Sequence, residues 1–167
     1  MAEIVNKVAE SGLITIDLEN FYPKEEIIEF DLKPFLFMEM ILKEKDFRER
    51  LDQENWEQYK DKKVTVFCST DAVIPMWAFM LISTKLAPYS EEVYFGNKNE
   101  TSEKLLLNNI KMINTDEFKD KRVVIKGCGD IEISPAAYLE ISNKLIPVVK
   151  SIMYGEPCST VPVYKKK

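Results

Sequence analysis

The residues of this chain best suited to chemistry are its three cysteines, Cys68, Cys128 and Cys158. The 167-residue sequence contains no histidine, which excludes Ser-His-Asp and Cys-His catalysis and every imidazole metal ligand. Thiolates and carboxylates remain as nucleophiles, bases and ligands. Thiolates select soft metals, so zinc or an iron–sulfur cluster is the cofactor that these residues predict. An odd number of cysteines disfavours a disulfide framework and indicates reduced thiols.

An internal repeat predicts the elements that position the cysteines. Tyr59-Lys-Asp-Lys-Lys-Val64-Thr-Val66 matches Phe118-Lys-Asp-Lys-Arg-Val123-Val-Ile125. Ile82–Pro88 and Val93–Gly96 match later segments at the same offset of about 59 positions. Each copy has the pattern of strand, helix and strand, which forms a right-handed parallel βαβ unit. The sequence therefore predicts an α/β fold, with a mainly parallel sheet made from two repeated βαβ units.

The bounds of these elements follow from their caps and breakers. The first helix has Pro75 in its first turn, and the second has Ser134 as its N-cap. A crossover helix joins the two copies. The predicted strands are 64–67, 93–95, 122–126 and 151–154, and the predicted helices are 71–86, 101–113 and 134–146.

The N-terminal third predicts extra strands and a helix beside this body. Alternating apolar residues indicate the strands, and a charged segment with one apolar side indicates the helix. The strands are expected near 12–17 and 27–31, with a further candidate at 34–42, and the helix within 43–59. We interpret 1–167 as a single domain, divided into 1–60, the duplicated body 61–158 and the tail 159–167.

Each cysteine follows a predicted strand. In one parallel sheet all carboxyl ends lie at the same edge, so a strand order that makes 64–67 and 122–126 neighbours brings Cys68, Cys128 and Cys158 together. That edge is the topological switch point, where open α/β sheets bind ligands. Asp71 is a fourth candidate metal ligand, although N-capping of the following helix is the commoner role for an aspartate at such a position.

Two local features favour thiolates at these positions. Cys68-Ser-Thr recurs as Cys158-Ser-Thr, and the amides and hydroxyls that follow a cysteine can donate hydrogen bonds to its sulfur. Helix N-termini near Asp71 and Ser134 would lower the pKa of the Cys68 and Cys128 thiols. Against this interpretation, a single cysteine is often a small core residue, and no pair has the CxxC spacing of a strong zinc site.

The remaining candidates are weaker. Asp130 occupies the place of Asp71 in the second copy, and Glu156 is a possible acid or base beside Cys158. The segment 127–129 lacks a complete phosphate-binding pattern. The apolar run Met76–Leu81 predicts a buried central helix rather than an interaction surface.

Charge and hydropathy exclude some classes of partner. A net charge of −5 and a pI near 5.0 argue against nucleic-acid binding, which needs clustered Lys and Arg. No apolar run approaches the roughly 18 residues that span a bilayer. We therefore expect a cytoplasmic protein without membrane or nucleic-acid partners.

Three segments of the sequence carry a resemblance to a known family, and they are Glu3-Ile-Val-Asn-Lys-Val-Ala-Glu-Ser-Gly-Leu-Ile-Thr15, Cys68-Ser-Thr-Asp-Ala-Val-Ile-Pro-Met-Trp-Ala78 and Ser151-Ile-Met-Tyr-Gly-Glu-Pro-Cys-Ser-Thr-Val-Pro-Val-Tyr-Lys165. They resemble an uncharacterised bacterial family, domain of unknown function 2480. The resemblance implies a link to iron–sulfur cluster assembly proteins, because genes of this family tend to lie beside cluster-assembly genes. It implies no reaction and no catalytic residue.

Three hypotheses follow. The first is a three-cysteine site that binds zinc or an iron–sulfur species and acts in cluster assembly. The second is a sulfur carrier or redox enzyme that uses one thiolate and a resolving cysteine. The third is a metal-free domain whose cleft takes a small anionic ligand or a partner protein.

Overall fold

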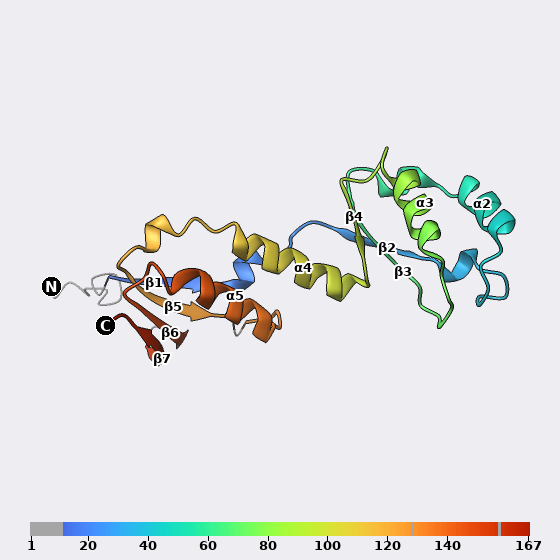
Figure 1. Cartoon of the computed structure of the whole chain (residues 1–167). Helices are drawn as coiled ribbons and strands as arrows, with labels where there is room; N and C mark the ends of the chain where they lie inside the picture. Colours follow the sequence, from blue (N-terminus) through green and yellow to red (C-terminus); the bar gives the residue numbers. More distant parts are fainter. Residues whose placement is uncertain (1–11, 128, 157) are drawn as a thin grey trace. The chain divides into compact units, whose positions relative to one another are not determined.

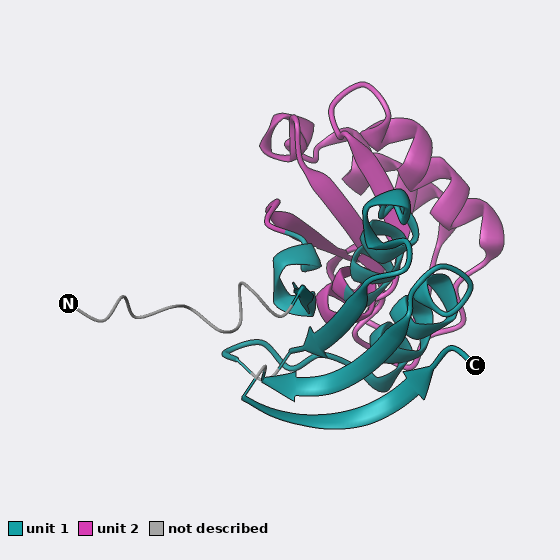
Figure 2. Cartoon of the chain, turned by 90° about the vertical axis from the view of Figure 1, so that its left-hand side faces the viewer, with its two compact units in different colours: residues 1–23, 103–167 teal, residues 24–102 magenta. Residues whose placement is uncertain are grey.

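The computed structural model describes residues 12–127, 129–156 and 158–167 (Figure 1). Over these residues the chain is a mixed α/β protein with four α-helices and two mostly parallel sheets. It divides into two compact units (Figure 2). Unit 1 comprises Met1–Pro23 and Glu103–Lys167, and unit 2 comprises Lys24–Ser102. Unit 1 is therefore built from two pieces of chain that flank unit 2 in the sequence.

Unit 2 has a three-stranded parallel sheet in the order β2-β3-β4. Its strands are β2 (Ile27–Asp31), β3 (Lys63–Phe67) and β4 (Glu92–Phe95), and its helices are α2 (Glu44–Asp52) and α3 (Met76–Leu86), with 3₁₀ turns η2 (Lys33–Phe35) and η3 (Trp56–Tyr59). Phe47 of α2, Ile82 of α3 and Val66 of β3 belong to one buried cluster. Both helices thus cover the same face of the sheet.

Unit 1 has a four-stranded sheet in the order β1-β5-β6-β7, in which only β7 is antiparallel. Its strands are β1 (Leu13–Asp17), β5 (Arg122–Lys126), β6 (Ser151–Glu156) and β7 (Ser159–Lys165), with helix α5 (Pro135–Leu145) and 3₁₀ turns η1 (Leu18–Phe21) and η4 (Asp116–Phe118). Helix α4 (Lys98–Lys111) contains the boundary between the units. Ile110 of α4, Ile141 of α5 and Val123 of β5 share a second buried cluster.

The start of α5 confirms its predicted cap. The Ser134 hydroxyl oxygen accepts a hydrogen bond from the Ala137 amide at 3.3 Å, and Pro135 is the first helical residue. The same hydroxyl donates to the Glu103 carboxylate. These contacts satisfy an N-terminal amide that has no partner within the helix.

The prediction of one sheet that joins both βαβ segments is wrong. β3 pairs with β2 and β4, whereas β5 pairs with β1 and β6, so β3 and β5 belong to different sheets. The physical reason is that the two N-terminal strands are not additions at one edge. β2 lies beside β3, and β1 lies beside β5. In the predicted single sheet, β3 and β5 would instead lie beside each other at these positions.

Helix α3 also differs from its prediction. It begins at Met76 rather than near Asp71, so Asp71 lies in an exposed loop and is not its N-cap. Met76 and Met80 are 72% and 69% exposed, which contradicts a helix buried on every side. Only its Ala78, Ile82 and Leu86 side is buried, because α3 covers one face of a small sheet.

Two further segments differ from their predicted structure. Instead of a strand, residues 34–42 contain the turn η2 and an isolated bridge between Phe37 and Ile41. The segment expected as a tail contains β7. No helix in the described part of the chain is both long and apolar enough to cross a membrane.

Candidate functional site

The described cysteines do not meet at one sheet edge. Cys68 follows β3 in unit 2 and is half-buried, whereas Cys158 is exposed in the turn between β6 and β7 of unit 1. Cys128 lies outside the described residues. The prediction that one sheet carries both Cys68 and Cys158 is wrong, because their strands belong to different sheets. Over the described ranges, no group of three or more Cys, Asp and Glu side chains is arranged to hold a metal ion.

The donors that follow Cys68 serve a neighbouring carboxylate. The Ser69 amide and hydroxyl donate to the two carboxylate oxygens of Asp31 at 2.9 and 2.5 Å. Burial raises the pKa of Asp31, but hydrogen bonds from Ser69 and from the Lys33 amide outweigh burial and leave the pKa below its usual value. These bonds tie the loop after β3 to the end of β2. Helix α3 starts eight residues beyond Cys68, so its N-terminus does not directly follow this thiol.

The carboxyl edge of the unit 1 sheet carries an ion-pair group. The Lys126 ammonium lies 3.5 Å from a carboxylate oxygen of Asp17 and 3.5 Å from one of Glu156. The charge of Glu156 and then that of Asp17 raise the pKa of Lys126. Lys126 therefore stays protonated at neutral pH and is unsuited to act as a base or nucleophile. Glu156, a candidate acid or base, is one of its partners.

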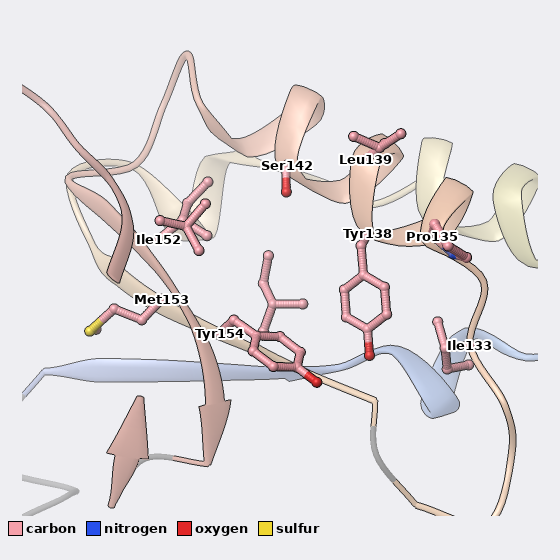
Figure 3. Close-up of a pocket in the computed structure, with 10 residues that line it drawn as sticks. Ile133, Pro135, Tyr138, Leu139, Ser142, Ile152, Met153 and Tyr154 are labelled. Atoms are coloured by element: carbon pink, nitrogen blue, oxygen red, sulfur yellow. The ribbon is translucent and has the colours of Figure 1, made fainter. Parts of the chain in front are cut away.

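A cavity of unit 1 lies between α5 and the strands β5, β6 and β7 (Figure 3). Its volume is about 550 Å³, within the range of small-molecule sites. The lining is largely apolar and includes Tyr138, Leu139, Ser142, Ile152, Tyr154 and Val163. Among the lining residues that the structure describes, the polar side-chain groups are the hydroxyls of Tyr138, Tyr154 and Ser142. The arrangement suits a ligand with an apolar body and a small number of polar groups.

Two tyrosines shape one end of this cavity. The rings of Tyr138 and Tyr154 meet edge to face, with centroids 5.7 Å apart and an interplanar angle of 75°. Their hydroxyls lie at the same end, away from Ser142 (Figure 3). A Cβ at Gly127 would lie 2.6 Å from the Tyr138 hydroxyl oxygen. Gly127 is therefore required for this hydroxyl to reach the end of β5.

Unit 2 carries a matching aromatic pair without hydroxyls. Phe79 and Phe95 also meet edge to face, at 5.5 Å and 87°, and they precede Tyr138 and Tyr154 by the spacing of the sequence repeat. At the position of Gly127, the earlier segment has Cys68. The cavity residues were not among the sequence candidates. The exchange of two phenylalanines for two tyrosines between the repeated segments is the signal that points to them.

Comparison with known proteins identifies the family. The model of the family "Protein of unknown function (DUF2480)" matches residues 2–166. The chain belongs to this family. No curated protein and no solved structure matches the chain. The DUF2480 description names no activity, so functional inferences rest on the residues of this chain.

Proposed function

We propose that this DUF2480 protein binds a small molecule with a largely apolar body in the cavity of unit 1. The observation that carries the proposal is the cavity of about 550 Å³ against α5. Ligand sites typically combine an apolar lining with a small number of placed polar groups. Here those groups are the hydroxyls of Tyr138, Tyr154 and Ser142. The proposal develops the third sequence hypothesis and places the ligand within unit 1 rather than between β3 and β5.

We also infer that the two units contain copies of one βαβ motif. Asp61 and Asp120 both adopt left-handed backbone conformations, with φ of 57° and 56°. The Asp61 amide donates to the Tyr89 carbonyl, as the Asp120 amide donates to that of Val148. The matched aromatic pairs support the same inference. On this basis unit 2 supplies an internal control for each substitution in the cavity of unit 1.

We expect that Leu139→Glu weakens binding of the neutral dye N-phenyl-1-naphthylamine at least tenfold. Leu139 lines the cavity and is 66% exposed, so a charge there disfavours an apolar ligand without disturbing the core. The measurement is a fluorescence titration of the full chain. Met80→Glu is the matched control, because Met80 is the repeat equivalent of Leu139 and is similarly exposed. Equal losses in both variants would contradict the proposed location.

Metal binding through Cys68, Cys128, Cys158 and Asp71 stays a separate proposal, with zinc or an iron–sulfur cluster as the cofactor and cluster-assembly proteins as partners. The chemistry of thiolates favours it, whereas the single-sheet arrangement that would have brought Cys68 and Cys158 together is absent from the described part of the chain, because the strands that precede them belong to different sheets. A thiol-based sulfur carrier likewise stays a hypothesis.

Metal and labile sulfide analysis of protein purified without oxygen tests the metal proposal. A thiolate site requires bound zinc or iron in the wild type and its loss in a variant with all three cysteines changed to serine. Equal metal content in the two proteins would rule out these cysteines as the ligands. The apolar-dye titration serves as the control that the variant is folded.

A further inference from the structure

The tyrosine end of the cavity coincides with the carboxyl edge of the unit 1 sheet. The Tyr138 hydroxyl lies against Gly127, the first residue after β5. Tyr154 lies two residues before the end of β6. A polar group of a ligand that reaches these hydroxyls is therefore exposed to the charges at this edge.

Carboxylates dominate that edge. The strand ends and the loop between β5 and α5 carry acidic side chains, namely Asp17, Glu19, Asp130, Glu132 and Glu156. Lys126 is the basic residue among them and is already paired with two carboxylates. One carboxylate oxygen of Glu19 is buried and has no hydrogen-bond partner among the described residues. The side chains at this edge of the sheet therefore carry a net negative charge, which attracts cations and repels anions.

Basic side chains lie at the opposite end of the same strands. Arg122 begins β5, Lys150 precedes β6, and Lys165 ends the antiparallel strand β7. These three residues line a separate cavity of about 230 Å³. The sheet of unit 1 is thus polarised along its strands, with its acidic end at the two tyrosine hydroxyls.

We infer that the ligand of this cavity is an amine, with an apolar, preferably aromatic, body and a protonated amino group at the tyrosine end. The inference rests on the proposed function. An ammonium group donates hydrogen bonds to phenol oxygens and is attracted to tyrosine ring faces. Edge-to-face packing against Tyr138 and Tyr154 favours an aromatic body. The negative charge of this edge repels anions, so it disfavours the small anionic ligand of the third hypothesis.

Three ligands with one ring system test the sign of the charge. Tryptamine, tryptophol and indole-3-acetate carry an ammonium, a hydroxyl and a carboxylate on the same indole. In calorimetric titrations of the full chain at low salt, we expect tryptamine to bind about tenfold more tightly than indole-3-acetate, with tryptophol between them. The difference will shrink as salt is added, because salt screens exposed charges.

A charge variant tests whether the preference for tryptamine over indole-3-acetate arises from the acidic carboxyl edge of the unit 1 sheet. Glu156→Gln should reduce the ratio of tryptamine to indole-3-acetate affinity about twofold to threefold. Glu117→Gln makes the same charge change in η4, before β5 begins, and should leave the ratio unchanged. A ratio that Glu156→Gln does not alter overturns the placement of the amino group.

The two proposals fail in different ways. Indole-3-acetate binding as tightly as tryptamine overturns the amine inference and leaves the cavity as a binding site. If neither the three indoles nor N-phenyl-1-naphthylamine binds, the proposed function itself is wrong.

Discussion

Replacing Gly155 with alanine will destabilise unit 1 by about 3 kcal/mol. Gly155 has a φ of 116°, a conformation that residues with a Cβ rarely adopt. A Cβ at this position would lie 2.6 Å from the backbone oxygen of Ser159, at the start of β7. Relief of this clash requires movement of β7, which contributes Val163 to the cavity. Urea unfolding followed by circular dichroism measures the loss, and dye binding will weaken in parallel.

Gly96→Ala is the matched control for this prediction. Gly96 has a similar φ of 127°, but its Cβ would meet Glu100, with the nearest atom a carboxylate oxygen 2.5 Å away. A flexible side chain can move where a strand backbone cannot. The Gly96 variant should therefore lose less stability and keep its dye binding. An equal or larger loss in the Gly96 variant would contradict this explanation.

Ile141→Ala and Ile82→Ala will each cost about 2–5 kcal/mol. Both side chains are fully buried, Ile141 in the cluster of unit 1 and Ile82 in that of unit 2. Each substitution leaves a cavity in one cluster only. Hydrogen exchange with peptide-level resolution should show faster exchange in 103–156 for the first variant and in 24–102 for the second.

The controls for this pair are an exposed substitution and the exchange pattern itself. Leu139→Ala, at a solvent-exposed position of the same helix as Ile141, should change stability by less than about 1 kcal/mol. If either isoleucine variant accelerates exchange equally in both units, the two clusters unfold as one cooperative body, and the prediction is wrong.

The elements with strong local signals were predictable from the sequence. β-Branched runs mark β3 and β5 within one residue of their observed bounds. Ser134 and Pro135 define the start of α5, because capping depends on residues next to one another in the chain. Mixed α/β architecture follows from the alternation of such segments.

Strand partners were not predictable in the same way. β1 and β2 are close in sequence, yet they join different sheets, and β1 pairs with a strand about 100 residues later. A second repeat does mark these strands as equivalent. Ile14-Thr-Ile-Asp-Leu-Glu-Asn-Phe21 matches Ile28-Glu-Phe-Asp-Leu-Lys-Pro-Phe35, and two equivalent first strands indicate two sheets rather than one.

The candidate site inherited this error. The predicted convergence of the cysteines depended on β3 and β5 being neighbours. Because the two strands belong to different sheets, the argument for a shared metal site loses its geometric basis. The cavity depends on how α5 lies against the sheet and on the antiparallel pairing of β7 with β6. Such packing between elements leaves no periodic pattern in the sequence.

The interrupted layout of unit 1 has a consequence for the order in which the protein folds on the ribosome. All residues of unit 2 lie between the two pieces of unit 1, so translation completes unit 2 first. β1 emerges early but must wait for β5, and the cavity is not enclosed until β7 has been synthesised. Because domains fold as units during synthesis, the cavity of unit 1 is among the last features that the nascent chain acquires.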